Sequence, residues 1–399
     1  MTITKKEPVK KTPAKKETVK KETVKKETVK KETVKKKVVE DKVVGMFDTL
    51  KAKIHKANKG IHCEVMSESN IATVSSWVPF PTYDLNRIVS GNLFKGIPEK
   101  SLTLLVGAEH TFKSSLAVLT AKSALKEGFK PIIFDTEGGI TGEFAKRWGL
   151  DLEKCLYVYS PWIEEIKSSI AQIKESQEQK FCIILDSIGG LDKIKSYDDA
   201  VKGDFKSDMG QLARAIKSTL KILVNVIKTQ NSIGVITSHF YSSSGIIPMP
   251  DSVVGGKAVL LLPDIIIYLK KAGKTDTTKS GADKLINTST IKNRFYPTNK
   301  FGQVSINYED GIDDFAGMIE IAVDMDIIEK KGGGNYSYKN DLISRGYENV
   351  LLEISSNKNL KSNILNDIDK KLENSGYSTL KEVELKDEIG KNKKDILDK

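Results

Sequence analysis

Four short segments, placed in a fixed order along the 399-residue chain, constrain its fold more than any other feature. The first leads out of an apolar run into a helical pattern, and each of the others ends an apolar, β-branched run with polar groups. They are GAEHTFKS at 107–114, FDTE at 134–137, IILDS at 183–187 and ITSH at 236–239. Parallel strands present chemistry in this way, at their carboxyl ends. We therefore predict an α/β fold with a largely parallel central sheet flanked by helices.

The first segment matches most of the phosphate-loop pattern G-x-x-x-x-G-K-[ST]. A predicted strand at 102–106 precedes it, and a predicted helix at 115–126 follows it. Backbone N–H groups at a helix N-terminus hold a polyphosphate, Lys113 would add a cation at the β- and γ-phosphates, and Ser114 would bind Mg²⁺. The predicted nucleotide-binding residues are Gly107, Ala108, Glu109, His110, Thr111, Phe112, Lys113, Ser114, Ser115 and, further along, Asp186. The alternative is an ordinary strand–loop–helix with a surface lysine.

Phe112 stands where the pattern has its second glycine. Glycine at that place permits an unusual φ and a close approach of the backbone to phosphate. We expect Phe112 to adopt a conventional φ and to turn its ring away from the phosphate loop.

Two acidic strand ends follow the phosphate loop. Asp186 ends the apolar run 181–185, and an aspartate in that place holds the Mg²⁺ shell opposite the serine of a phosphate loop. Asp135 and Glu137 end another apolar run, and a carboxylate there would orient and deprotonate an attacking water. Taken singly, Glu137 and Asp186 could each be a helix-capping or solvated acid, which is the commoner fate of a carboxylate in a loop. Together with Lys113, they favour a site that hydrolyses ATP with Mg²⁺.

These segments, with others in the same order, resemble the RecA family of recombinases, and most closely its phage UvsX branch. The resemblance extends from Ile71 to Leu372, and the phosphate loop ends in FKS as in that branch. The further segments are DTEGG at 135–139, LDS at 185–187, the glycine pair 255–256, KNR at 292–294, YEDGI at 308–312 and YSYK at 336–339. The resemblance implies a RecA-like P-loop ATPase core, a small N-terminal oligomerisation segment and a small α/β C-terminal domain.

The resemblance also implies roles for single residues. Glu137 would be the general base for water, and Asp186 the Walker B acid, which holds Mg²⁺ through a water molecule. His239 stands where the family has a polar residue that senses the γ-phosphate and passes that state to a DNA-binding loop; many relatives carry glutamine there. Lys292 and Arg294 resemble a basic pair that reaches across a filament interface to a neighbour's ATP.

The basic pair has an argument of its own. The segment 287–295 reads as a strand, in which residues two apart face the same side. Lys292 and Arg294 would therefore repel each other unless an anion lies opposite. A phosphate supplied by another subunit would serve, as an arginine finger does in trans. The alternative is an exposed strand face in solvent.

Two segments are too polar and glycine-rich to belong to the core, namely 189–208 and 240–256. Basic residues interleaved with aromatic ones suit single-stranded DNA, because cations neutralise phosphates and bases stack on rings. The resemblance places two DNA-binding loops here. The predicted DNA-binding residues are Lys202, Phe205, Lys206, Arg214, Tyr241, Gly255, Gly256 and Lys257. By composition alone, both segments fit ordinary surface loops.

The formal net charge is +11, and it is concentrated at the N-terminus. Residues 1–44 hold 16 lysines and 7 acidic residues and repeat KETVK four times between Lys16 and Lys35, which predicts a disordered polycationic tail. We expect an N-terminal helix over 46–59 and a C-terminal domain that opens with a helix over 315–330. The predicted boundaries are 1–44 for the tail, 45–80 for a subunit-docking segment, 81–314 for the ATPase core, 315–372 for the C-terminal domain and 373–399 for a charged tail.

The three cysteines are odd in number and widely spaced, which indicates free thiols and a reducing cytoplasm. With four histidines in the chain, no structural zinc site suggests itself, and no apolar run reaches the roughly 20 residues that span a bilayer. The predicted location is the cytoplasm, or the host cytoplasm if a phage encodes the chain.

The prediction for function is an ATP-dependent recombinase that forms filaments on single-stranded DNA and exchanges strands with homologous duplex DNA. Its predicted partners are single-stranded DNA, homologous duplex DNA and further copies of itself. A single-stranded-DNA-binding protein and a mediator are further candidate partners. One alternative is a nucleotide-binding mediator or paralogue with little hydrolysis. Another is a RecA-core helicase or loader.

Overall fold

The computed structural model describes residues 45–58, 61–69, 71–174, 179–203, 209–240, 253–274, 282–309 and 311–374. The chain divides into two compact units, residues 1–73 and 74–399. In the first unit a helix covers 45–57, so the predicted N-terminal helix is confirmed over most of its length. Its apolar side chains Met46, Phe47 and Leu50 are exposed. Within the described residues, no helix is long and apolar enough to cross a membrane.

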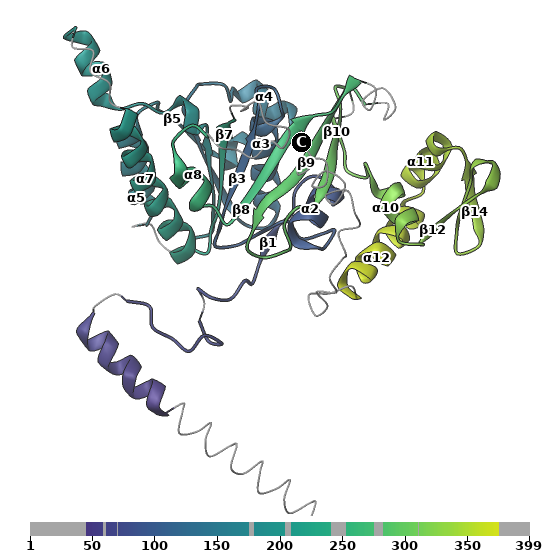
Figure 1. Cartoon of the computed structure of the whole chain (residues 1–399), viewed down its shortest axis with the longest axis horizontal. Coiled ribbons are helices and arrows are strands. Elements are labelled where there is room, and N and C mark those ends of the chain that lie inside the picture. The colour runs from purple at the N-terminus through teal and green to yellow at the C-terminus, as the bar shows by residue number, and fades with distance from the viewer. Residues whose placement is uncertain are drawn as a thin grey trace, which may run out of the picture. The chain divides into compact units, whose positions relative to one another are not determined.

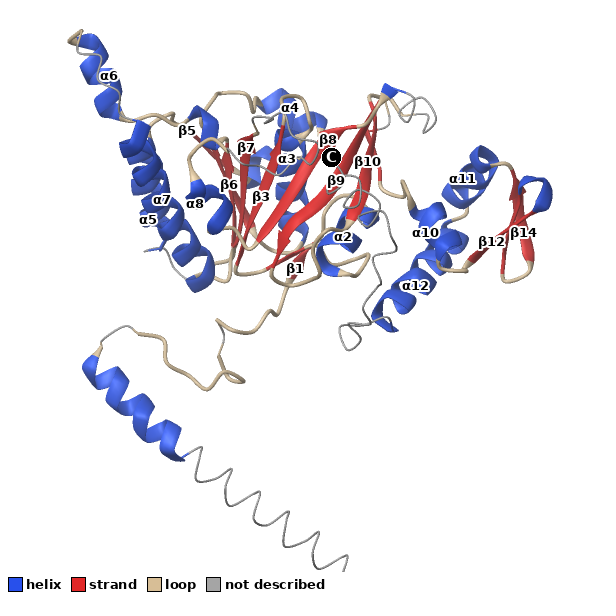
Figure 2. Cartoon of the chain, in the orientation of Figure 1, coloured by secondary structure: helices blue, strands red, loops and turns tan. Residues whose placement is uncertain are grey.

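A nine-stranded sheet forms the centre of the second unit (Figures 1 and 2). In sheet order the strands are β11 (Gly311–Asp313), β10 (Phe301–Asn307), β9 (Lys284–Asn293), β8 (Ile265–Lys271), β3 (Ser101–Gly107), β7 (Ile233–His239), β6 (Phe181–Asp186), β4 (Lys130–Asp135) and β5 (Leu156–Tyr159). The six strands from β8 to β5 are parallel, and β9, β10 and β11 extend the sheet in antiparallel fashion. The predicted, largely parallel sheet is confirmed.

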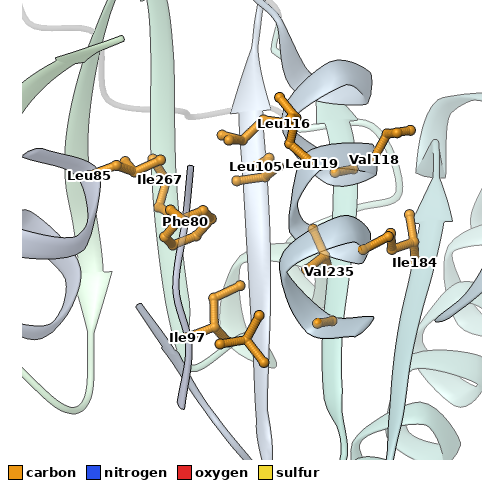
Figure 3. Close-up of a cluster of buried hydrophobic side chains, with 14 of the residues drawn as sticks. Phe80, Leu85, Ile97, Leu105, Leu116, Val118, Leu119, Ile184, Val235 and Ile267 are labelled. Atoms are coloured by element: carbon orange, nitrogen blue, oxygen red, sulfur yellow. The ribbon is translucent and has the colours of Figure 1, made fainter. Parts of the chain in front are cut away.

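Helices cover both faces of this sheet and bury two separate apolar clusters. Along β3, Leu105 packs into one cluster and Leu104 and Val106 into the other, as alternation in a doubly covered strand requires. Figure 3 shows the first cluster, where Leu116 and Leu119 lie beside Leu105. Its helices are α2 (Tyr83–Ser90), α3 (Lys113–Lys126) and α4 (Gly142–Arg147); those of the second are α5 (Ile163–Lys174), α7 (Met209–Thr229) and α8 (Lys257–Leu261).

Smaller elements complete this unit. The strands β1 (Trp77–Val78) and β2 (Ile97–Pro98) form a two-stranded antiparallel pair. Two 3₁₀ helices, η1 (Leu152–Lys154) and η2 (Ile188–Gly190), follow α4 and β6 along the chain. The helix α6 (Ile194–Val201) lies inside the segment that we predicted as a DNA-binding loop, and it has no buried residue.

The C-terminal part of the unit has an apolar cluster of its own. The predicted helix over 315–330 is wrong in length, because α10 covers Met318–Asp324 and a strand begins at Ile328. Asp326 has a φ of 51°, and a residue in the left-handed region ends a helix. The remaining elements are β12 (Ile328–Lys331), η3 (Gly332–Gly334), β13 (Asn335–Tyr338), β14 (Asp341–Arg345), α11 (Tyr347–Ser356) and α12 (Lys358–Asn374).

Candidate active site

The carboxyl ends of four neighbouring parallel strands gather the predicted site residues. Gly107 at the end of β3 pairs with His239 at the end of β7, and Asp135 at the end of β4 pairs with Asp186 at the end of β6. A cavity of about 380 Å³ lies here, lined by Glu109, His110, Thr111, Phe112, Lys113, Ser114, Ser115, Glu137, Phe144, Asp186, Ser187, His239 and Lys284. A larger cavity of about 800 Å³, beside α2 and β9, contains none of these residues. The chemistry therefore points to the smaller cavity.

The loop before α3 has the compact form that a phosphate-binding loop requires. A Cβ on Gly107 would lie 2.4 Å from the carbonyl oxygen of Leu269, so the loop has no room for a side chain there. The Thr111 hydroxyl donates to the carbonyl of Ala108 at 2.7 Å. Lys113 Nζ donates to the carbonyls of Gly107 and Ala108, at 3.0 and 2.7 Å. Burial lowers the pKa of Lys113, although nearby carboxylates act in the opposite direction. A phosphate that enters the loop would stabilise the charged form of this lysine.

Phe112 contradicts our expectation for its backbone. Its φ is 75°, in the left-handed region, where we expected a conventional value. The ring packs edge-to-face against Trp148, with ring centroids 5.2 Å apart, and joins the first apolar cluster. The loop thus keeps the positive φ that a glycine would supply, and the packing of the ring offsets the strain, which is about 1 kcal/mol or more.

Asp186 and Ser114 form the candidate metal site. The Asp186 carboxylate accepts hydrogen bonds from the hydroxyls of Ser114 and Thr237. Burial raises the pKa of Asp186, and so do Asp135 and Glu137, while the two hydrogen bonds lower it. A buried carboxylate beside a hydroxyl is an all-oxygen donor set that fits Mg²⁺, which binds few protein groups and keeps several waters.

Asp135 and Glu137 have different surroundings, and these agree with the choice of Glu137 that the resemblance implied. The Asp135 carboxylate accepts the backbone N–H of Glu137, Gly138 and Ile140, at 3.1, 2.8 and 2.8 Å, so it holds the turn together. Glu137 is exposed, lines the cavity, and accepts a hydrogen bond of 2.5 Å from the Ser187 hydroxyl. Glu137 is therefore the carboxylate placed to act on a ligand.

His239 lies between the cavity and both candidate DNA loops. It lines the cavity, and a Cβ on Gly189 would lie 3.4 Å from its Cδ2 atom. Gly189 belongs to η2, where the first predicted loop begins, and Phe240 after His239 begins the second. A change at the cavity thus has a short path to both loops, as the predicted sensor role needs.

The bases of the two predicted DNA loops lie together. Gly255 and Gly256 have φ values of 94° and 81°. A Cβ on Gly255 would lie 2.7 Å from Cγ2 of Ile188, and one on Gly256 would lie 3.6 Å from Cβ of Ala213, the residue before Arg214. The side chains of Lys202, Arg214 and Lys257 are exposed. Three further predicted DNA contacts, Phe205, Lys206 and Tyr241, lie outside the described residues.

Lys292 and Arg294 are not part of this cavity. The predicted strand is confirmed as far as Asn293, so Arg294 follows it. Lys292 Nζ donates to the carbonyl of Leu261 at 2.7 Å, and Arg294 Nη1 pairs with Asp264 Oδ1 at 3.1 Å. Both cations thus lie near the first residue of β8, at the end of the sheet away from Gly107. The predicted trans contact with a neighbour remains a prediction.

Sequence reasoning missed three residues of the site. Ser187 and Thr237 lie within the segments LDS and ITSH, beside residues that we did predict. The Ser187 hydroxyl bonds to Glu137 and the Thr237 hydroxyl to Asp186, but no sequence pattern indicates either bond. Lys284 begins β9, far along the chain, and no motif marks it. Its pKa is lowered by burial and by Lys271, and none of the described residues forms a hydrogen bond or ion pair with its Nζ.

Comparison with known proteins agrees with this geometry. The RecA N-terminal domain family matches residues 82–313, more than half of the chain. The chain belongs to the RecA family. The RecA C-terminal domain family matches residues 316–373.

Among curated relatives, Protein RecA of Clostridioides difficile (strain 630) is 28% identical over 299 residues, which cover 72% of this chain and 83% of the relative. Protein RecA of Rickettsia africae (strain ESF-5) is 26% identical over 278 residues, 68% of this chain and 80% of the relative. Protein RecA of Aquifex aeolicus (strain VF5) is 25% identical over 260 residues, which cover 64% of this chain and 73% of the relative. The predicted RecA-family fold is confirmed, while the UvsX branch remains a prediction.

Proposed function

We propose that this RecA-family chain is a DNA-dependent ATPase that forms filaments on single-stranded DNA and carries out homologous pairing and strand exchange. The observation that carries the proposal is the single cavity in which the phosphate loop, Glu137 and Asp186 meet. The bases of the two candidate DNA loops adjoin the same cavity through Gly189 and His239. This closeness supports a coupling between the proposed nucleotide and DNA sites.

The proposed reaction is the in-line attack of water on the γ-phosphate of ATP. Glu137 orients and deprotonates this water, and the Ser187 hydroxyl holds the carboxylate in place. Lys113 exchanges its two loop carbonyls for phosphate oxygens. Ser114 and Asp186 would hold Mg²⁺, which would supply positive charge that stabilises the phosphates of the bound nucleotide. Lys292 and Arg294 of a neighbouring copy would stabilise the charge that develops.

The proposed coupling to DNA runs through His239. ATP would hold this side chain by its γ-phosphate, and hydrolysis would let the loops after Phe240 and Gly190 relax. In a His239→Ala variant, we expect ATP to lose its effect on the affinity for single-stranded DNA. Unchanged ATP-dependent affinity in that variant would remove His239 from the coupling.

The exposed edge of the sheet supports self-assembly. β5 is the last strand, and its Leu156, Tyr157 and Tyr159 are exposed. An unpaired edge with apolar side chains is a template for another chain. We propose that the segment before Val74 of an adjacent copy docks here, and that such contacts repeat head to tail into a helix.

The finer identity is also a proposal. The FKS ending of the phosphate loop favours the phage UvsX branch, with the host cytoplasm as the location. A single-stranded-DNA-binding protein and a mediator would then be natural partners, because the filament must replace other proteins on DNA.

The decisive experiment is the rate of ATP hydrolysis with and without single-stranded DNA, with Lys113→Ala as the blank. We expect a rate that rises strongly with DNA and vanishes in the variant. A wild-type rate equal to the blank under both conditions would overturn the proposal and favour a nucleotide-binding mediator. The left-handed Phe112 weighs against that alternative, because the loop retains a glycine-like backbone.

A further inference from the structure

The carboxylate of Asp135 holds the backbone turn that carries Glu137, the candidate general base. Asp135 is 1% exposed, and four donors saturate its carboxylate. Oδ1 accepts the N–H groups of Glu137 and Gly138. Oδ2 accepts the N–H of Ile140 at 2.8 Å and the hydroxyl of Tyr157 at 3.0 Å. Three donors belong to the turn that Asp135 itself begins, and among the described residues only Tyr157 reaches it from another strand.

Tyr157 connects this turn to the surface. It lies on β5, the edge strand, and its side chain remains 47% exposed. Partial burial and the bond to Asp135 raise the pKa of Tyr157 to about 12. The phenol therefore keeps its proton at physiological pH and acts only as a donor toward the carboxylate.

We propose that Tyr157 is a positioning residue for Glu137, and that through it hydrolysis responds to whatever covers the β5 edge. The inference rests on the proposed role of Glu137. Without the phenol, Oδ2 keeps one bond and the turn loosens, so that Glu137 no longer holds water at one fixed place.

A strand docked on the β5 edge would exclude water from the phenol. A hydrogen bond to a carboxylate strengthens when the local dielectric falls. Assembly of copies would therefore tighten the turn under Glu137, and the rate of hydrolysis would rise with assembly for a reason separate from the trans cations.

The test compares Tyr157→Phe with Tyr308→Phe. Tyr308 follows β10, away from the β5 edge and the cavity; it is 75% exposed, and its hydroxyl makes no hydrogen bond within the described residues. We expect Tyr157→Phe to lower kcat about tenfold or more, the loss expected for one hydrogen bond to a charged group. The KM for ATP and the affinity for fluorescent ADP should not change, since the phosphate loop is untouched, and the Tm should fall only slightly. Tyr308→Phe should behave as wild type.

Two further readouts decide the matter. In Tyr157→Phe, amide hydrogen exchange at Glu137, Gly138 and Ile140 should speed up, and the rise of kcat with protein concentration should flatten. Unchanged exchange at these amides would overturn the proposal even if the protein proved to have no ATPase activity. Equal losses in kcat, ADP affinity and Tm would also overturn it, because they would mark general disruption. Wild-type activity no higher than that of Lys113→Ala would instead count against the proposed function.

Discussion

Phe112 carries the left-handed backbone that the phosphate-loop pattern assigns to glycine. A side chain in this region costs about 1 kcal/mol or more, unless packing elsewhere offsets it. Here the ring packs against Trp148, which lies after α4 on another turn of the chain. Phe112 therefore makes two opposite contributions to stability, backbone strain and ring packing. Substitutions that remove one or both of them measure each contribution.

We predict an inverted order of stability at this position. Phe112→Ala loses the ring and keeps the strain, and it should destabilise the protein by about 3–4 kcal/mol. Phe112→Gly loses the same ring but relieves the strain, so its loss should be about 1 kcal/mol smaller. Denaturant unfolding measures both free energies. An alanine variant more stable than the glycine variant would show that the left-handed φ is not strained.

Lys284 gives a second prediction at this scale. It lines the cavity with a pKa lowered by burial, and none of the described residues pairs with its Nζ. A bound polyphosphate would be its natural countercharge, so Lys284→Ala should weaken ADP and ATP binding about tenfold. Lys271→Ala is the matched control, since Lys271 lies one strand away and does not line this cavity. Fluorescent-nucleotide titration measures both.

The pH dependence of this effect has a definite sign. A lysine attracts phosphate only while protonated, so its contribution is present below its pKa and lost as the pH rises through it. Because burial lowers the pKa of Lys284 in the unliganded protein from the ordinary lysine value, the gap in affinity between wild type and Lys284→Ala should begin to close below pH 10.5. A gap that stays constant up to that pH would mean that the lysine acts through packing alone.

At the scale of elements, α8 and η2 lie close together at the bases of the two candidate DNA loops. Gly255, just before α8, combines a φ of 94° with close contacts to Ile188 of η2 and Val259 of α8. No side chain fits there without moving one of these elements. At Gly255, therefore, the described end of the second loop lies directly against the start of the first.

We predict that Gly255→Ala uncouples DNA from hydrolysis. The added methyl group would meet Ile188 and Val259 at under 3 Å and would displace the loop bases. Stimulation of ATPase activity by DNA should fall about tenfold or more, while ADP affinity stays unchanged. Gly128→Ala is the control, because Gly128 has a φ of 80° and no atom near the added Cβ. Equal effects of the two substitutions would reduce the role of Gly255 to backbone strain.

For the whole molecule, the strand register separates the two halves of the proposed site. Asn293 pairs with Ile265, which pairs with Thr103, whereas the phosphate loop follows Gly107. Four residues of strand span about 13 Å. Lys292 and Arg294 therefore lie too far from their own chain's phosphate loop to touch the same ATP, and under the proposed mechanism a second copy would have to supply them.

Mixing two inactive variants tests this arrangement. Lys113→Ala lacks a working phosphate loop and Arg294→Ala lacks the proposed trans cation, so each alone should hydrolyse ATP slowly. In an equal mixture on DNA, about a quarter of the interfaces would combine two intact halves, and activity should recover to about that fraction of wild type. A mixture no more active than its components would contradict a site shared between copies.

Much of the site follows from the sequence alone, because its signals are local. A buried strand, a tight loop and a helix mark Lys113 and Ser114, and apolar runs that stop at an acid mark Asp135, Glu137 and Asp186. In a parallel sheet such stops must meet at one edge. The fold class and most of the cavity lining could therefore be predicted without coordinates.

Other features depend on contacts between residues far apart in the chain, and only the tertiary structure decided them. The positive φ of Phe112 and the contact of its ring with Trp148 are such features, and so are the hydrogen bonds from Tyr157 to Asp135 and from Ser187 to Glu137. Lys284 reaches the cavity because β9 returns antiparallel beside β8. Backbone angles and the partners of carboxylates are set by packing energies that no short segment contains, because each needs two chain segments in contact.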